Sequence, residues 1–273
     1  MAEGEPTDIL VDNLRPIAHA QAGIPADAWV MTSTPRQAVS TIGVNPRLAG
    51  GSDERFTGYG AMGVPFSGGH YLAFRDMLAS SFGKPYRAIW HRDPTGRWTI
   101  FTTTDPDASC PRYFGSVTAV QQVPAIEVTW TDDWTMDVTM GARLSWRLRL
   151  GATPATRAMT SMGGATPQWA WNSDAVLGPM GPMATGFLRS GRIRLHGRTP
   201  NGQGFKAAPL QVWRVVGGHA ELDGADMGAL GPLREQTRLG DFWLPQRGLF
   251  FVGQARFTAP VPIVRTPAME HVS

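Results

Sequence analysis

Histidine and tyrosine side chains are the residues of this chain best suited to proton transfer. His70 and Tyr71 follow the pair Gly68-Gly69 in a predicted strand, and Tyr113 lies in the predicted loop 105–116. An imidazole or a phenol in the wall of a barrel can act as a general acid or base. His70, Tyr71 and Tyr113 are therefore the candidate catalytic residues. The alternative is that each is a hydrogen-bonded structural side chain.

Three further polar sites favour structural roles. His91 lies close to a predicted turn. Asp132 and Asp133 form a carboxylate pair, but they stand in a loop between two strands, where aspartates commonly make turns. Cys110 lies near Arg112 and Tyr113, which suits an activated thiol, yet a lone cysteine is more often buried and inert.

The motifs that identify cofactor, metal or nucleophile enzymes are missing from the sequence. There is no phosphate-binding loop, no dinucleotide-binding fingerprint and no G-x-S-x-G elbow. The six histidines include no two at metal-ligand spacing, and Cys110 is the only cysteine. We therefore expect no cofactor, no metal site and no internal disulfide.

Tryptophan is the most distinctive residue of the chain, which contains 10 of them. Aromatic side chains can line a cavity for an apolar or cationic ligand. The alternative is an ordinary aromatic-rich core. The candidate ligand-binding residues are Trp90, Trp98, Trp130, Trp146, Trp169 and Trp171.

Several of these tryptophans lie in residues 125–150, whose pattern predicts three consecutive antiparallel strands. Apolar and polar residues alternate with period two in each strand, which gives one apolar and one wet face. Loops of about three residues make the strands neighbours. The pattern predicts a curved sheet with four buried side chains: Trp130, Trp134, Trp146 and Leu148.

Other segments extend this β pattern. Residues 86–104 predict a hairpin around the turn Asp93-Pro94-Thr95-Gly96, covered on both faces. A second hairpin turns at 200–202, and strands are predicted at 69–75 and 247–257.

One helix is predicted, around residues 173–190, with breaks at Pro179 and Pro182. Residues 151–171 have no clear period and are predicted to form a loop. The predicted fold is mainly β: an antiparallel barrel or strongly bent sheets with one proline-interrupted helix.

Three regions follow from these patterns. Residues 1–55 are rich in proline and glycine and predict an irregular lead-in or lid. Residues 56–258 form the β body. An alternative organisation of this body is two related halves, 56–150 and 191–258, joined by a helical segment. Residues 259–273 form a tail.

Charge disfavours a nucleic-acid-binding protein. The net charge is only +3, and Lys84 and Lys206 are the only lysines among scattered arginines. Without a basic stripe, we expect no specific nucleic-acid binding. No signal peptide and no apolar run of about 18 residues is visible, so we expect a cytoplasmic protein without a membrane span.

Five blocks of the sequence resemble a group of mostly actinobacterial proteins of similar length. The resemblance covers roughly residues 60–257 and implies no catalytic residue, because the group shares no motif of known role. More loosely, the layout is similar to lipocalin-like proteins, including hydratase and cyclase relatives that act on terpenoids. The blocks are GHYLAFR, WHRDPTGRWTIF, CPRYFG, TPNGQGF and GDFWLPQRGLFFVG.

Three functions remain open from the sequence. The first is a cofactor-independent enzyme that isomerises, cyclises or hydrates a hydrophobic small molecule such as a terpenoid, polyketide or lipid. The second is a non-catalytic carrier of lipocalin type that uses the same cavity. The third is an interaction protein with a filled barrel. The oligomeric state is left open.

Overall fold

The computed structural model describes residues 33–258, which are built around one sheet of 12 strands. The strand order is β5-β4-β3-β2-β1-β14-β10-β8-β7-β6, with β9 and β11 paired to β10. All pairs are antiparallel except β4 with β5. The strands are β1 (Glu54–Pro65), β2 (Tyr71–Ser80), β3 (Tyr86–Arg92), β4 (Trp98–Thr102), β5 (Ala119–Gln122), β6 (Glu127–Trp130), β7 (Thr135–Met140), β8 (Leu144–Gly151), β9 (His196–Arg198), β10 (Gly204–Leu222), β11 (Ala225–Asp226) and β14 (Leu249–Phe257).

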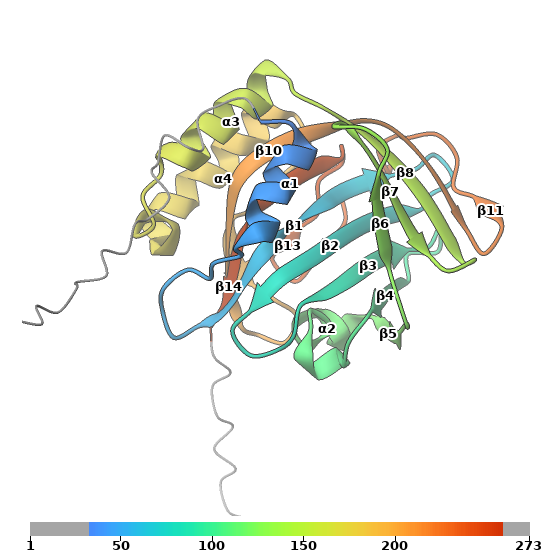
Figure 1. Cartoon of the computed structure of the whole chain (residues 1–273), viewed down its shortest axis with the longest axis horizontal. Coiled ribbons are helices and arrows are strands. Elements are labelled where there is room, and N and C mark those ends of the chain that lie inside the picture. The colour runs from blue at the N-terminus through green and yellow to red at the C-terminus, as the bar shows by residue number, and fades with distance from the viewer. Residues whose placement is uncertain (1–32, 259–273) are drawn as a thin grey trace, which may run out of the picture. The chain divides into compact units, whose positions relative to one another are not determined.

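The sheet curls strongly into a half-barrel (Figure 1). Side chains link its two ends: Arg143, just after β7, donates to Gln121 of β5 at 3.1 Å. Near the same ends, Arg87 of β3 donates to the carbonyl of Ile126, just before β6, at 2.8 Å. Strands at opposite ends of the order therefore face each other across one inner surface. The prediction of a mainly β protein made of strongly bent sheets is confirmed.

The inner face of the sheet is filled by the largest apolar cluster. It combines side chains from strands near both ends of the order, such as Phe101 of β4 and Met136 of β7. Helix α1 (Pro35–Val44) adds Ala38 and Ile42 to the same cluster. Curling of the sheet brings these side chains together and removes their apolar surface from water, which stabilises the curled form.

The outer face carries a second apolar cluster, which includes Phe56, Tyr71, Trp90 and Phe257. Three further groups of elements cover this face. Helices α3 (Pro154–Ala165) and α4 (Asp174–Leu188) lie beside β10 and β14 (Figure 1). The short helix α2 (Pro111–Phe114) and the small sheet of β12 (Arg238–Leu239) and β13 (Phe242–Trp243) cover the rest.

The three predicted strands at 125–150 are confirmed as β6, β7 and β8, which pair antiparallel in sequence order. Trp146 and Leu148 are fully buried, as predicted. Trp130 and Trp134 are only half-buried, so that part of the prediction is wrong. The reason is position: β6 is the last strand of the order, and Trp134 stands in the loop before β7.

Both predicted hairpins are also present. In the first, Trp90 pairs with Ile100 and His91 with Thr99, which is the predicted register. Gly96 in its turn has a φ of 93°, a conformation that glycine adopts without strain. The second hairpin joins β9 and β10, and β10 continues for 19 residues where the sequence pattern predicted separate short strands.

The helices depart most from the sequence prediction. Helix α3 occupies part of the predicted loop 151–171, and α4 runs unbroken through Pro179 and Pro182. Burial of one side of α4 against the sheet offsets the backbone hydrogen bonds that the prolines cannot make. The predicted helix around 173–190 is therefore confirmed in its position as α4, but it is not interrupted and it is not the only helix.

Helix α1 lies inside the segment 1–55 that was predicted to be irregular. Thr34 and Gln37 form a capping box at its start, and Pro35 occupies the first turn, where its missing N–H costs nothing. The expected lid at 1–32 and tail at 259–273 lie outside the described residues. Within 33–258, no helix combines the length and apolar character needed to cross a membrane.

Candidate functional site

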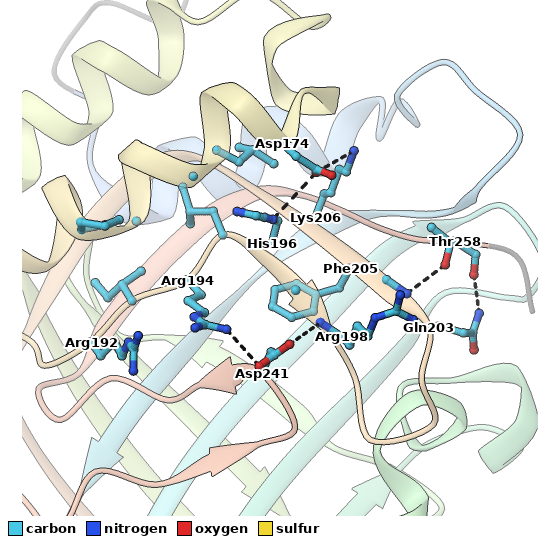
Figure 2. A pocket seen from close by; sticks show the side chains of 18 of the residues that line it. Asp174, Arg192, Arg194, His196, Arg198, Gln203, Phe205, Lys206, Asp241 and Thr258 are labelled. Carbon is cyan, nitrogen blue, oxygen red and sulfur yellow. Dashed lines mark hydrogen bonds and ion pairs between the residues drawn. The ribbon is translucent and has the colours of Figure 1, made fainter.

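Two neighbouring spaces lie beside helix α4. The larger, which we call the polar pocket, has a volume of about 1380 Å³ and is drawn in Figure 2. The smaller, the apolar cavity, has a volume of about 130 Å³. A single layer of side chains separates them, because five residues line both: Ile193, Arg194, Leu195, Phe205 and Lys206.

The charged groups of the polar pocket neutralise one another. Arg194 pairs with Asp241 at 2.9 Å, and Lys206 pairs with Asp174 at 3.0 Å (Figure 2). His196 lies 3.8 Å from the same Asp174 carboxylate. These groups are partly exposed, so the pairs are screened by water and contribute little binding energy for an added anion.

Two further arginines of the polar pocket also have partners. The guanidinium of Arg192 lies over the ring of Trp243, 5.0 Å from its centre. Arg198 donates to the carbonyl of Gly202 at 3.1 Å. Both arginines are exposed. The polar pocket therefore resembles a solvated, internally paired surface more than a preorganised anion site.

The apolar cavity has the opposite character. It lies between the outer face of the sheet and helices α3 and α4, with β13 at one side. Its volume is close to the ~150 Å³ of engineered apolar cavities that stay dry and bind benzene. Seven aromatic residues line it: Phe56, Tyr59, Phe205, Phe242, Trp243, Phe251 and Phe257.

Arg75 is the one deeply buried charged side chain among the lining residues of the apolar cavity. It is 4% exposed, and its guanidinium carbon lies 4.5 Å from the ring centre of Trp90 and 5.2 Å from that of Phe242. Within residues 33–258, its Nε has no hydrogen-bond partner and no carboxylate pairs with the guanidinium. Burial lowers the pKa of Arg75, because the charged form is poorly solvated there.

The polar groups around Arg75 are neutral. Burial raises the pKa of Cys110, and it raises the pKa of Tyr71 and Tyr86 well above that of a free phenol. Trp90 donates its indole N–H to the Cys110 sulfur at 3.2 Å. Arg75 therefore lies among dipoles and rings, with no negative charge close by in the described residues.

Strand alternation explains how Arg75 comes to this place. On β2, Tyr71, Ala73 and Met77 share the outer face with Arg75, while Leu72 and Phe74 belong to the inner cluster. Other elements cover both faces of β2, so the side chains on both faces, including that of Arg75, are buried. The sequence signal that identifies the site is a single arginine at period two among apolar residues of a strand covered on both faces. Our sequence analysis missed it.

The three candidate catalytic residues lie at different places. The Oη of Tyr113 donates to Glu54 at 2.6 Å, and Nδ1 of His70 lies 2.9 Å from Nε2 of His91. Tyr71 is fully buried, and its hydroxyl has no hydrogen-bond partner among the described residues. None of the three lines the polar pocket or the apolar cavity, and their catalytic role stays a prediction.

The six candidate tryptophans are spread over the whole body. Trp90 and Trp98 belong to the outer cluster, and Trp146 and the half-buried Trp130 belong to the inner one. Trp171 is buried beneath α4, whereas Trp169 is 69% exposed. None of the six lines either space, although Trp90 stacks on Arg75. Ligand binding by these tryptophans stays a prediction.

No metal cluster is visible in the part of the chain that the structure describes. There, no three His, Cys, Asp or Glu side chains gather closely enough to hold an ion. Neither of the two lysines is a buried amine without a charged partner, since Lys206 is ion-paired with Asp174 and Lys84 is exposed.

Comparisons with known proteins add no family. No protein-family model and no curated protein sequence matches the chain. Among solved structures, the chain is similar to acetoacetate decarboxylase from Legionella pneumophila, with 10% sequence identity and a TM-score of 0.29. That match covers 78% of this chain and 90% of the other. Values this low carry no argument about activity, so function has to rest on the geometry of the chain itself.

Proposed function

We propose that this protein binds a small hydrophobic molecule in the apolar cavity between its sheet and helices α3 and α4. The observation that carries the proposal is an apolar, ring-lined space of about 130 Å³. Small-molecule sites in proteins are typically concave and mostly apolar, and this space is concave, partly open to the surface and almost entirely apolar.

The size of the cavity limits the ligand. A space slightly smaller than known benzene-binding cavities accepts one aromatic ring or a short acyl chain. A terpenoid or polyketide would also need the side-chain wall next to the polar pocket to move aside. The proposal therefore favours a smaller ligand than most of those considered from the sequence.

The expected affinity is modest. Burial of about 200 Å² of apolar ligand surface at ~25 cal/mol/Å² contributes roughly 5 kcal/mol before association costs. Association costs lower this figure, so a purely apolar ligand should bind with a dissociation constant of about a millimolar or above. Tighter binding requires a polar contact inside the cavity.

The same cavity serves both an enzyme and a carrier, which differ in whether the ligand leaves changed. Binding is the step that they share. The enzyme alternative needs a proton donor, and Tyr71, on the same face of β2 as Arg75, is the candidate that we propose, although it does not line the cavity. Analysis of the ligand after long incubation with the protein separates the two alternatives.

A matched pair of helix variants tests binding. Ala184 lines the cavity and is 2% exposed, while Ala175 lies exposed on the same helix. We expect Ala184→Leu to fill the cavity and to weaken binding of benzene or toluene about tenfold. Ala175→Leu should leave binding unchanged. Ligand-observed NMR titration of the wild type and both variants measures this.

Two results contradict the proposal. One is a wild-type protein that binds neither benzene nor toluene at millimolar concentration. The other is equal binding by the wild type and Ala184→Leu, which would place the ligand elsewhere.

A further inference from the structure

Within residues 33–258, the guanidinium of Arg75 is a buried cation without a counter-charge. Buried charged groups in proteins are normally paired or bound to a ligand, because an isolated charge away from water is costly. The buried carboxylate of Asp76 follows this rule. On the inner face, Asp76 is 4% exposed and pairs with Arg87 at 2.8 Å. Arg75, next in sequence and on the opposite face, has no such partner within residues 33–258.

Every element that packs around Arg75 contributes a neutral group. Tyr71 comes from the same strand, Tyr86 and Trp90 come from β3, and Cys110 precedes α2. From β13, Phe242 adds an aromatic ring. None of these side chains can balance a full positive charge.

The stacked rings hold the guanidinium in place without occupying its donors. Trp90 and Phe242 contact it through cation–π interactions, which use the flat face of the guanidinium. The N–H groups of an arginine point outward in the plane of the group, in a fork that matches a carboxylate. Arg75 lines the apolar cavity, and its buried Nε has no hydrogen-bond partner within residues 33–258.

We infer that the ligand of the apolar cavity is a small monocarboxylic acid, with its carboxylate on Arg75 and its apolar part against the surrounding rings. The inference rests on the proposed function, since it names the chemical class of the same ligand. One aromatic ring or a short acyl chain fills the available volume. The carboxylate supplies the negative charge that the described residues lack.

A carboxylate fits this place better than a phosphate. Of the charged residues that line the cavity, only Arg75 lacks a charged partner within residues 33–258, because Lys206 and Arg194 are already paired with Asp174 and Asp241. A phosphate monoester carries up to two charges and needs several donors, whereas a carboxylate is satisfied by one bidentate guanidinium.

The test compares an acid with its neutral counterpart of the same shape. Calorimetric titration of the wild-type protein with benzoate and benzamide should show benzoate binding at least about tenfold more tightly. In Arg75→Met the preference should vanish, so that both compounds bind with similar affinity. Arg75→Lys keeps a charge without the planar fork and should retain only part of the preference.

Arg198→Gln is the control for a general electrostatic effect. Arg198 is exposed and lines the polar pocket but not the apolar cavity, so its loss should leave the preference for benzoate within about twofold. A preference lost in Arg198→Gln but kept in Arg75→Met would overturn the assignment to Arg75.

Failure of the inference differs from failure of the proposed function. Binding of benzene and benzamide without any preference for benzoate overturns the carboxylate inference and leaves the apolar ligand intact. Absence of binding by all three compounds overturns both. If Arg75→Met fails to fold, the comparison of benzoate with benzamide on the wild type and on Arg75→Lys still decides the question.

Discussion

Nδ1 of His70 lies 2.9 Å from Nε2 of His91, and the two imidazole rings stack with their centres 5.2 Å apart. The contact joins the start of β2 to β3, where Leu72 and His91 are paired across the strands. One ring nitrogen must donate and the other accept, so the pair is stable only while at least one ring carries an acceptor nitrogen. This requirement makes the pair sensitive to acid.

The pair predicts a loss of stability between pH 6.5 and 4. Burial, followed by the charge of His70, lowers the pKa of His91 from 6.5 to about 4. The unfolded chain binds a proton at His91 throughout that range and the folded chain does not, so the free energy of unfolding falls as the pH falls. The loss from this residue should approach roughly 3 kcal/mol at pH 4.

Urea unfolding at a series of pH values measures the effect, with His91→Gln as the control. Glutamine cannot titrate, so the variant should show a shallower fall of stability over the same range, whatever its stability at pH 7. Equal slopes in the wild type and His91→Gln would contradict the prediction.

A second prediction concerns the buried carboxylate of Asp76. It accepts hydrogen bonds from Tyr59 at 2.9 Å and from Arg87 at 2.8 Å. Arg87→Met leaves this carboxylate buried with only the tyrosine, which should cost about 3 kcal/mol of unfolding free energy. Chemical denaturation measures the loss.

An exposed pair of the same type is the control. Arg147 and Asp137 also pair across neighbouring strands, but the Arg147 side chain is 62% exposed. Arg147→Met should leave stability nearly unchanged. The double variant Asp76→Asn with Arg87→Met should lose less than Arg87→Met alone, because it removes the unpaired charge. A double variant less stable than Arg87→Met would contradict this account.

Strand alternation made the sheet predictable. The period-two pattern at 125–150 identified β6, β7 and β8, and the turn at Gly96 fixed the register of β3 with β4. These signals are local, because each strand shows its two faces within a few residues. The helices were harder, since α3 and α4 depend on burial against β10 that their own sequences do not display.

The candidate site could not be predicted in the same way. Arg75 falls in the predicted strand 69–75, but its environment is created by Trp90, Cys110 and Phe242, which come from three other segments. The contact between His70 and His91 likewise required the pairing of β2 with β3, which residue spacing does not reveal. Long-range contacts of this kind determine which polar residues form a candidate site, and the spacing of residues in the sequence does not show them.

Two glycines of α4 give a third prediction. A Cβ at Gly181 would lie 2.7 Å from the carbonyl oxygen of Ile193, whereas a Cβ at Gly186 would meet nothing within 4 Å. Gly181→Ala should therefore push the helix away from its neighbour and cost about 1–3 kcal/mol. Gly186→Ala should stabilise the protein by up to about 1 kcal/mol, because alanine favours the helix.

Thermal unfolding compares these two variants directly. For a chain of this size, each 1 kcal/mol shifts the midpoint by about 2–4 °C. The wild type should lie between Gly186→Ala above and Gly181→Ala below. The reverse order would mean that the approach of α4 to Ile193 is looser than described.

The last prediction concerns the single thiol. Cys110 is 2% exposed, accepts a hydrogen bond from Trp90, and has a pKa raised by burial, so it is both inaccessible and protonated near neutral pH. We expect a thiol reagent such as DTNB to react with the folded protein at least about a hundredfold more slowly than with the urea-unfolded chain, because reaction requires opening of the fold. Arg87→Met, which lowers stability from the other face of the sheet, should speed the reaction in proportion to its loss of stability. Rapid labelling of the stable wild type would instead identify Cys110 as an accessible, activated thiol and would bring the nucleophile hypothesis back.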